Sequence, residues 1–293
     1  MNQPLLQEPV QAAVKPKRGG ASIGQLLLDS GKITPENAER VLRMQKEQNI
    51  RFGEAAQRLG LITEADIQQV LARQFDYSYV QPGAGDFAPT LLAAYQPFGP
   101  QVETLRAVRS QLMLRWFARE RKALAIVSVD ADDGASVFAA NLAVVFSQLG
   151  EQTLLVDGNL RQPQQQDIFG LKQRQGLSDV LGGRAGLDAV GKIDSFVSLS
   201  VLGAGTLPPN PQELLSRANF GQLNEQLEQR YDVVLYDVAP FRAGADAIAI
   251  GARLGGVLLV ARKNKTSLDE VAAFSEQLQR AGIEVVGSVL HDF

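Results

Sequence analysis

The chain has 293 residues, of which 45% are hydrophobic and 21% charged, and its formal net charge is −3. That length fits one large domain and a small one, and that charge gives no argument for nucleic acid or for an acidic membrane surface as a partner. There is no cysteine and a single histidine, His291, which excludes disulfides, thiolate catalysis, Ser-His-Asp triads and multi-histidine metal sites. No apolar run approaches the roughly 20 residues of a membrane span, and the polar N-terminus lacks the apolar core of a signal peptide. The sequence therefore predicts a cytoplasmic protein.

Composition shifts divide the chain into segments. The predicted segments are a disordered basic leader (1–20), a small helical two-repeat domain (21–79), a Pro/Gly-rich linker (80–100) and a large α/β domain (101–293).

The small domain is predicted from an internal repeat, because residues 22–45 align without gaps on residues 51–74. Each copy predicts a short helix, a glycine stop and a second helix, with Thr34 or Thr63 as the N-cap of the second helix. One such hairpin is too small to be stable, so the two copies are expected to bury each other's apolar faces.

The large domain is predicted to begin with a helix over 101–119. Strands are expected at 124–129, 153–157, 199–202, 233–236, 256–261 and 284–290. These runs are apolar throughout instead of alternating, which is typical of parallel strands buried on both faces. Helical segments between most of them predict a doubly wound, mostly parallel sheet of the P-loop NTPase type. Ligands of such folds bind at the carboxyl ends of the strands.

The first strand runs into a turn with the layout of a phosphate-binding loop. Such loops need Gly-Lys-Ser/Thr, where backbone N–H groups wrap a phosphate, the lysine meets its charge and the hydroxyl holds Mg²⁺. Here Gly134 and Ser136 are kept, Ala135 stands in the lysine position, and Val137 follows. We expect Gly134, Ser136 and Val137 to contact a bound ATP or ADP, with Ser136 also a magnesium ligand.

Three acidic residues in the same turn, Asp130, Asp132 and Asp133, argue against phosphate binding. Two like charges about 4 Å apart repel by about 1 kcal/mol in water and about 4 kcal/mol at an effective dielectric of 20. Losing the lysine removes an attraction of similar size. The loop therefore indicates a nucleotide site that has stopped turning over nucleotide.

Two further strand ends carry carboxylates. Asp157 ends the strand at 153–157, and Asp237 follows the strand at 233–236. A carboxylate at a buried strand end beside a phosphate loop is suited to hold Mg²⁺ or to orient a nucleophile. We expect Asp237 to serve Mg²⁺ and Asp157 to act as a base. Arg161, shortly after Asp157, is a candidate nucleotide contact.

At this point residues 101–293 resemble the cytoplasmic kinase domain of bacterial tyrosine kinases, the autokinases that act with chain-length-determinant proteins in exopolysaccharide synthesis (the EpsG type). The matching segments are 102–112, the loop with 139–143, 154–161, 205–215, 231–240 and 256–266. The resemblance implies Mg²⁺-ATP-dependent phosphorylation of tyrosine.

The sequence departs from that family's pattern at several positions. Family members have Lys at Ala135, Asp at Asn159, Thr-Pro at 238–239 and Asn near His291, and they carry a C-terminal tyrosine cluster, whereas no tyrosine lies beyond Tyr236. A degenerate regulatory component of exopolysaccharide biosynthesis and chain-length control is therefore favoured, and an active kinase stays open as the alternative. A partitioning-type ATPase of the same loop class is disfavoured by Asp130.

The resemblance also implies partners. Glu103, Arg106 and Arg109 resemble the family's oligomerisation motif and fall on one helix face, which suits ion pairing between subunits. A ring-like homo-oligomer and a membrane chain-length-determinant protein are the expected partners, which would place the chain peripherally at the inner face of the membrane.

The repeat at 22–74 resembles the N-terminal domain of type II secretion and type IV pilus ATPases, including the variant that binds cyclic di-GMP. The resemblance implies these candidate contacts for that ligand: Arg51, Gly24, Gly31, Gly53, Gly60, Gln45 and Gln74. A cyclic di-GMP receptor that uses this repeat is therefore a further alternative function of the chain. The structural interpretation is a helical docking module whose glycines are only C-caps.

Two polar regions of the large domain are interpreted as structural. Asp246 and Asp269 are expected at solvated helix starts, and residues 162–167 are expected to form a surface loop after Arg161.

Overall fold

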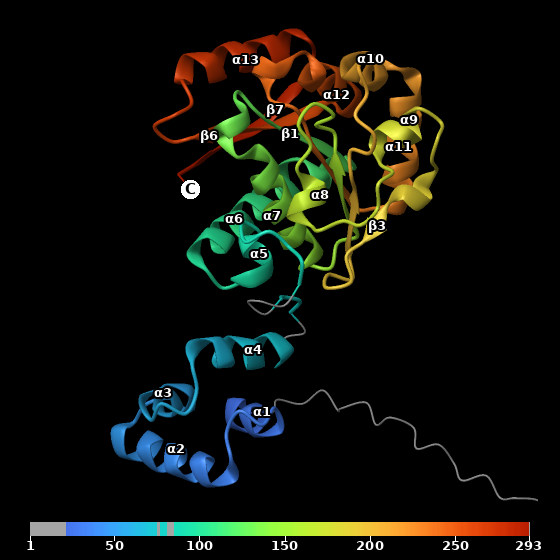
Figure 1. Ribbon diagram of the computed structural model, residues 1–293. Coiled ribbons are helices and arrows are strands. Elements are labelled where there is room, and N and C mark those ends of the chain that lie inside the picture. Colours follow the sequence, from blue (N-terminus) through green and yellow to red (C-terminus); the bar gives the residue numbers. More distant parts are fainter. Residues whose placement is uncertain (1–21, 75–76, 81–84, 293) are drawn as a thin grey trace, which may run out of the picture. The chain divides into compact units, whose positions relative to one another are not determined.

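The computed structural model describes residues 22–74, 77–80 and 85–292, which form two compact units divided between Tyr77 and Ser78 (Figure 1). The predicted leader over 1–20 lies outside the described residues. Within them, no helix combines the length and apolar character needed to cross a bilayer.

The N-terminal unit consists of two helical hairpins. Its helices are α1 (Ile23–Asp29), α2 (Pro35–Gln48), α3 (Phe52–Arg58) and α4 (Glu64–Gln74). The Thr34 side chain caps α2 by accepting the N–H of Asn37 at 3.2 Å, and the Thr63 hydroxyl accepts the N–H of Asp66 at 3.3 Å. Helix α1 contacts α3 and α4, and α2 contacts α3, around a small apolar core. The two copies of the repeat therefore share one core, as the sequence predicts.

The glycines of the repeat have two distinct structural roles. A Cβ on Gly24 would lie 3.1 Å from the Phe52 ring, and a Cβ on Gly53 would lie 3.1 Å from Ile67, so both sit at tight helix contacts. Gly31 and Gly60 have φ of +68° and +67°, the left-handed conformation that ends a helix at little cost for glycine. Packing and helix termination thus account for all four.

The C-terminal unit is built on a single seven-stranded sheet of order β3-β4-β2-β5-β1-β6-β7. Its strands are β1 (Ala123–Ser128), β2 (Thr153–Asp157), β3 (Gly191–Lys192), β4 (Leu199–Leu202), β5 (Val233–Asp237), β6 (Gly256–Arg262) and β7 (Glu284–His291). All pairings are parallel except that of β3 with β4. The sequence predicts all of these strands except β3, which has only two residues.

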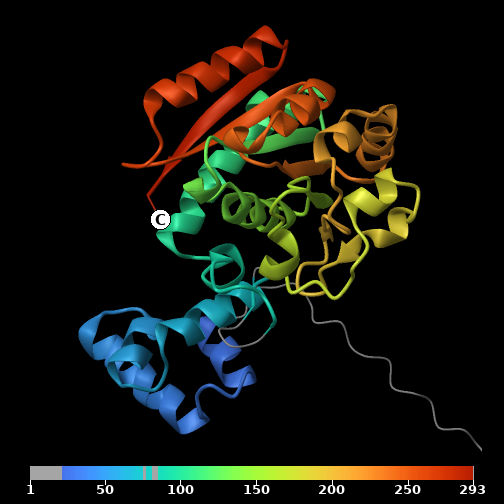
Figure 2. The ribbon, with the colours of Figure 1, turned by 45° about the horizontal axis from the view of Figure 1, so that its top comes forward.

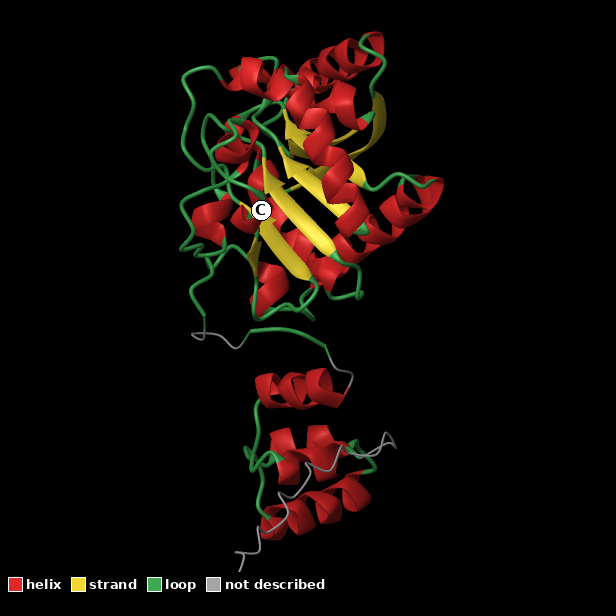
Figure 3. Cartoon of the chain, turned by 90° about the vertical axis from the view of Figure 1, so that its right-hand side faces the viewer, coloured by secondary structure: helices red, strands yellow, loops and turns green. Residues whose placement is uncertain are grey.

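Helices cover both faces of this sheet, so the strand sequences are apolar on both sides (Figure 3). The helices are α5 (Leu92–Tyr95), α6 (Pro100–Arg115), α7 (Ala135–Ser147), α8 (Gln165–Ile168), α9 (Leu177–Leu181), α10 (Pro211–Ser216), α11 (Ala218–Arg230), α12 (Asp246–Leu254) and α13 (Leu268–Arg280). In β1, Leu124 and Ile126 face the core formed with α5, α6 and α7, whereas Ala125 and Val127 face the core formed with α9 to α13. Helix α13 runs beside β7 in the C-terminal part of the chain (Figure 2).

Much of the predicted linker over 80–100 is part of the C-terminal unit. Leu91, Ala93 and Ala94 are fully buried in the core beside α7. The side chain of Asn141 in α7 accepts the N–H of Ala93 at 2.8 Å and donates to the Thr90 carbonyl at 2.9 Å. The Pro and Gly content indicates irregular backbone, and here the irregular backbone is packed against the fold.

Candidate nucleotide site

The turn after β1 has the chain path of a phosphate loop. The first turn of α7 follows directly on Gly134, whose φ is +75°. A Cβ at Gly134 would lie 3.1 Å from the His291 ring, so the close approach also requires glycine. Ala135 is the first residue of α7 and only 4% exposed. Gly134, Ser136 and Val137 thus lie at the N-terminal end of a helix that points from the carboxyl edge of the sheet.

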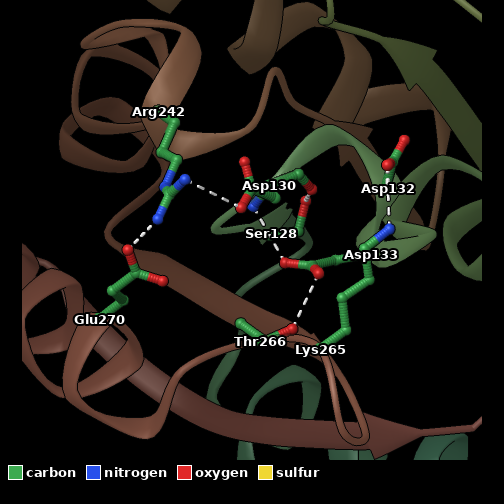
Figure 4. Close-up of polar contacts among 8 residues, drawn as sticks. All are labelled: Ser128, Asp130, Asp132, Asp133, Arg242, Lys265, Thr266 and Glu270. Atoms are coloured by element: carbon green, nitrogen blue, oxygen red, sulfur yellow. Dashed lines mark hydrogen bonds and ion pairs between the residues drawn. The ribbon is translucent and has the colours of Figure 1, made fainter.

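The aspartate loop, defined here as residues 130–134, is braced by residues far away in sequence (Figure 4). Asp133 is fully buried, and its carboxylate accepts the N–H of Asp130 at 2.9 Å and the Thr266 hydroxyl at 2.8 Å. Asp132 pairs with Lys265 at 2.9 Å, which holds the pKa of Asp132 below its ordinary value.

Asp130 in turn lies 3.4 Å from the guanidinium of Arg242, which also pairs with Glu270. Each carboxylate of the aspartate loop therefore has a cationic or hydroxyl partner. The repulsion expected among these carboxylates is compensated, because the tertiary fold brings up Arg242, Lys265 and Thr266. The loop is still expected to disfavour phosphate, because Lys265 is already paired with the carboxylate of Asp132.

The two strand-end carboxylates lie side by side, because β2 and β5 are neighbours and Asp157 is in register with Asp237. Both are fully buried. The Asp157 carboxylate accepts the backbone N–H groups of Asn159, Gln164 and Gln165 at 3.2, 3.1 and 2.9 Å. We call Asp157 and Asp237 the carboxylate pair.

Asp237 contacts the phosphate loop directly. Its Oδ1 accepts the Ser136 hydroxyl at 3.1 Å, and its Oδ2 accepts the side-chain amide of Gln165 at 2.7 Å. Burial raises the pKa of Asp237 to about 6, although the bonds from Gln165 and Ser136 lower it. Burial, and then the charge of Asp237, raise the pKa of Asp157 well above its ordinary value.

Arg161, the predicted nucleotide contact, is paired with a carboxylate of the protein. Its guanidinium donates to Asp246 through Nε at 2.6 Å and Nη2 at 3.0 Å, and that bond raises the pKa of Arg161. Asp246 begins α12 as expected, but its side chain is 1% exposed instead of solvated. A buried carboxylate needs such a partner, and the assignment of Arg161 as a nucleotide contact stays a prediction.

Gln165 was not identified from the sequence, which predicts residues 162–167 as a surface loop. The structure shows Gln165 fully buried at the start of α8, where Nε2 also donates to the Ser136 carbonyl at 3.0 Å. Its neighbours Gln164 and Gln166 are exposed and half-buried. Three consecutive glutamines carry no signal for which one faces inward, so only the fold could identify it.

Ser136 and Asp237 are the residues that the sequence predicts as ligands of Mg²⁺. Ser136 and Asp237 offer oxygen ligands at a strand end, which is the chemistry a hard cation prefers. Their arrangement is unfavourable for a resident ion, because each carboxylate oxygen of Asp237 already accepts one hydrogen bond from the protein. Within the described residues there is also no group of three or more Asp, Glu or His side chains placed to hold a metal.

The predicted oligomerisation residues lie on α6. Glu103 pairs with Arg106 at 2.7 Å and keeps a side-chain exposure of 73%. Arg106 also donates to the Pro97 carbonyl at 2.5 Å, and Arg109 donates to the Val145 carbonyl at 2.8 Å. Both arginines therefore bind within their own protomer, and Glu103 is the member of the motif that faces outward.

The remaining candidate contacts for cyclic di-GMP are spread over the N-terminal unit. Arg51 is exposed and precedes α3, and Gln45 is half-buried in α2. Gln74 ends α4, and its side chain lies outside the described part. Gly24 and Gly53 are buried in helix contacts, so they are not open to a ligand.

A parallel sheet with a glycine-serine loop after β1 and acidic residues ending β2 and β5 defines a P-loop-type α/β domain. No protein-family model matches the chain. The chain is 33% identical over 189 residues to the putative tyrosine-protein kinase CapB of Staphylococcus aureus, covering 64% of this chain and 83% of CapB. It is 32% identical over 201 residues to the tyrosine-protein kinase Wzc of Salmonella typhi, covering 69% of this chain. The chain spans only 28% of the length of Wzc.

Among solved structures, the kinase domain of the Escherichia coli tyrosine kinase ETK matches with a TM-score of 0.68 and 30% identity, covering 74% of this chain and 85% of that one. The chain therefore belongs to the bacterial tyrosine-protein kinase family.

Proposed function

We propose that the chain is a degenerate, tyrosine-kinase-like regulatory component of exopolysaccharide biosynthesis and chain-length control, weak or inactive in ATP hydrolysis and phosphotransfer. The observation that carries the proposal is Ala135, an uncharged residue that is 4% exposed at the first position of α7. A phosphate loop depends on a lysine at this position. The pairing of Arg161 with Asp246 and of Lys265 with Asp132 adds support, since neither cation can replace the lysine without leaving a carboxylate unpaired.

The test is calorimetric titration of the full chain with Mg²⁺-ATP. We expect no binding in the micromolar range from the wild-type chain. The variant Ala135→Lys should gain affinity, and Ala135→Gln, of similar length but uncharged, should not. Micromolar ATP binding by the wild-type chain, together with transfer of phosphate to tyrosine, would establish the active kinase instead.

The proposal includes a ring-like homo-oligomer and docking on a membrane chain-length-determinant protein, through which the chain would be peripheral at the membrane. The exposure of Glu103 on α6 supports a role for this helix at a subunit contact. Light scattering on Glu103→Arg is expected to show a smaller assembly than the wild-type chain. Glu225→Arg, an equally drastic change on the exposed side of α11, is the matched control and should leave the assembly intact.

We propose no second function for the N-terminal unit. Two of the four candidate glycines, Gly24 and Gly53, pack against Phe52 and Ile67 and are closed to a ligand. This unit is better accounted for as a helical docking module.

A further inference from the structure

One glutamine contacts three residues at the centre of the candidate site. The Gln165 Nε2 atom donates to Asp237 Oδ2 at 2.7 Å and to the Ser136 carbonyl at 3.0 Å. The backbone N–H of the same residue donates to Asp157 Oδ2 at 2.9 Å. Gln165 thus joins both members of the carboxylate pair to the first turn of α7.

The position of the Gln165 amide is the one that a cation would take. Asp237 Oδ1 is already bonded to the Ser136 hydroxyl, so Oδ2 is the oxygen left to coordinate an ion. The two protons of Nε2 face that oxygen and the Ser136 carbonyl, which are both acceptors. A divalent ion binds oxygen lone pairs, and the amide occupies one lone pair of Asp237 Oδ2 and places an N–H group beside that oxygen, which disfavours the approach of a cation.

The other end of the amide indicates what fixes its orientation. The Gln165 Oε1 atom is buried and has no hydrogen-bond partner among the described residues. A buried acceptor without a partner is unfavourable, so the two bonds of Nε2 must outweigh that cost. Turning the amide over would place Oε1 against the Asp237 carboxylate, where two acceptors repel. The two hydrogen bonds donated by Nε2 therefore fix the orientation of the Gln165 side chain.

We propose that Gln165 is a positioning residue that substitutes for the cation at the carboxylate pair and keeps divalent ions off Asp237. The sheet edge is thereby held together with no metal bound. This inference does not depend on the proposed function, and it takes Ser136 and Asp237 as the magnesium ligands that the sequence predicts.

The test uses Mn²⁺ alone, without nucleotide, so its outcome is independent of the ATP titration. Binding is measured on the full chain from the loss of the electron paramagnetic resonance signal of free Mn²⁺. The wild-type chain is expected to bind no more tightly than millimolar. Gln165→Met, which keeps the size of the side chain and removes its donors, should bind at least about tenfold tighter, a gain of about 1.4 kcal/mol.

Two further variants make the result specific. Gln165→Glu supplies a carboxylate in place of the amide, so it should bind Mn²⁺ more tightly again and gain thermal stability when Mn²⁺ is added. Adding Asp237→Asn to Gln165→Met should abolish the gained site. Gln164→Met, at the exposed neighbouring position, is the control and should bind Mn²⁺ like the wild-type chain.

Micromolar Mn²⁺ binding by the wild-type chain would overturn the proposal. So would equal, weak binding by wild type, Gln165→Met and Gln165→Glu, which is the result expected if Gln165 were only a structural cap. If Gln165→Met does not fold, the proposal is decided by the thermal stability of Gln165→Glu measured with and without Mn²⁺.

Discussion

The aspartate loop and the carboxylate pair both gather negative charge at the carboxyl edge of the sheet, and the protein neutralises them differently. The loop is partly open to water, with the Asp132 side chain 78% exposed, and its partners are the long cationic side chains of Lys265 and Arg242. The carboxylate pair is fully buried, and its partners are backbone N–H groups, a hydroxyl and an amide. Neutral donors can be buried at much lower desolvation cost than a cation, so depth decides the kind of partner.

This comparison predicts that the buried region contributes more to stability than the exposed one. The largest effect is expected for Asp157→Ala, which leaves the N–H groups of Asn159, Gln164 and Gln165 without their acceptor. At about 1–3 kcal/mol for each unsatisfied buried group, the free energy of unfolding should fall by at least about 3 kcal/mol in urea denaturation. Asp157→Asn keeps an acceptor oxygen and should lose less. Equal losses in the two variants would contradict this assignment.

The second prediction concerns pH. The pKa of Asp237 is raised from 3.8 to about 6 in the folded state, so folding favours the protonated form. Its contribution to stability is fully present below about pH 4 and is lost as the pH rises through about 6. Asp157 shifts in the same direction. The free energy of unfolding should therefore fall by on the order of 1–3 kcal/mol between pH 4 and 7.

The control for this pH dependence is Asp237→Asn, which removes the titrating group and keeps the size of the side chain. In this variant the slope of stability against pH over the same interval should be much smaller. A wild-type stability that rises with pH across the interval would refute the assignment.

The third prediction tests the one buried carboxylate of the aspartate loop. Thr266→Val removes the hydroxyl that donates to Asp133 and keeps the shape of the side chain. We expect a loss of about 1.5–3 kcal/mol in the free energy of unfolding, the usual range for a hydrogen bond to a charged group. Thr266→Ser retains the hydroxyl and should be close to wild type. If Ser and Val are equally destabilising, packing of the methyl group matters more than the bond.

The smallest effect is expected for Lys265→Met, which removes the exposed ion pair with Asp132. Such pairs contribute little in water and are screened by salt. The melting temperature should change by less than about 1 °C at low ionic strength and not at all in 1 M NaCl. A large loss that persists in 1 M NaCl would mean that the aspartate loop depends on this lysine and that the two regions are more alike than proposed.

The pattern of apolar and polar residues along the sequence was sufficient to predict much of the fold. Apolar runs and the residues that end them predicted β1, β2, β4, β5, β6 and β7, and the repeat predicted the helical hairpins of the N-terminal unit. Neighbouring residues were enough because strand burial and helix termination depend on side chains a few positions apart. The same reasoning predicted that the glycine-serine loop and the strand-end carboxylates lie at the carboxyl ends of the strands, and in the structure Ser136 contacts Asp237 there.

The same local pattern could not predict features that depend on contacts between residues far apart in the sequence. The Pro/Gly segment over 80–100 was predicted as a linker, but Asn141 in α7 supplies the hydrogen bonds that fold part of it onto the core. The sequence near Arg161 also gave no indication that this residue pairs with Asp246, 85 positions away.

The sequence by itself determined the kind of domain, the order of its strands along the chain and the loss of the lysine at Ala135. Only the tertiary structure decided how the excess negative charge is held. It placed Lys265 and Thr266 against the aspartate loop, more than 130 positions away in the chain, and it chose Gln165 from three adjacent glutamines. The compensation of a charge depends on its distance from other charges and on its burial, and neither can be inferred from the neighbouring residues in the sequence.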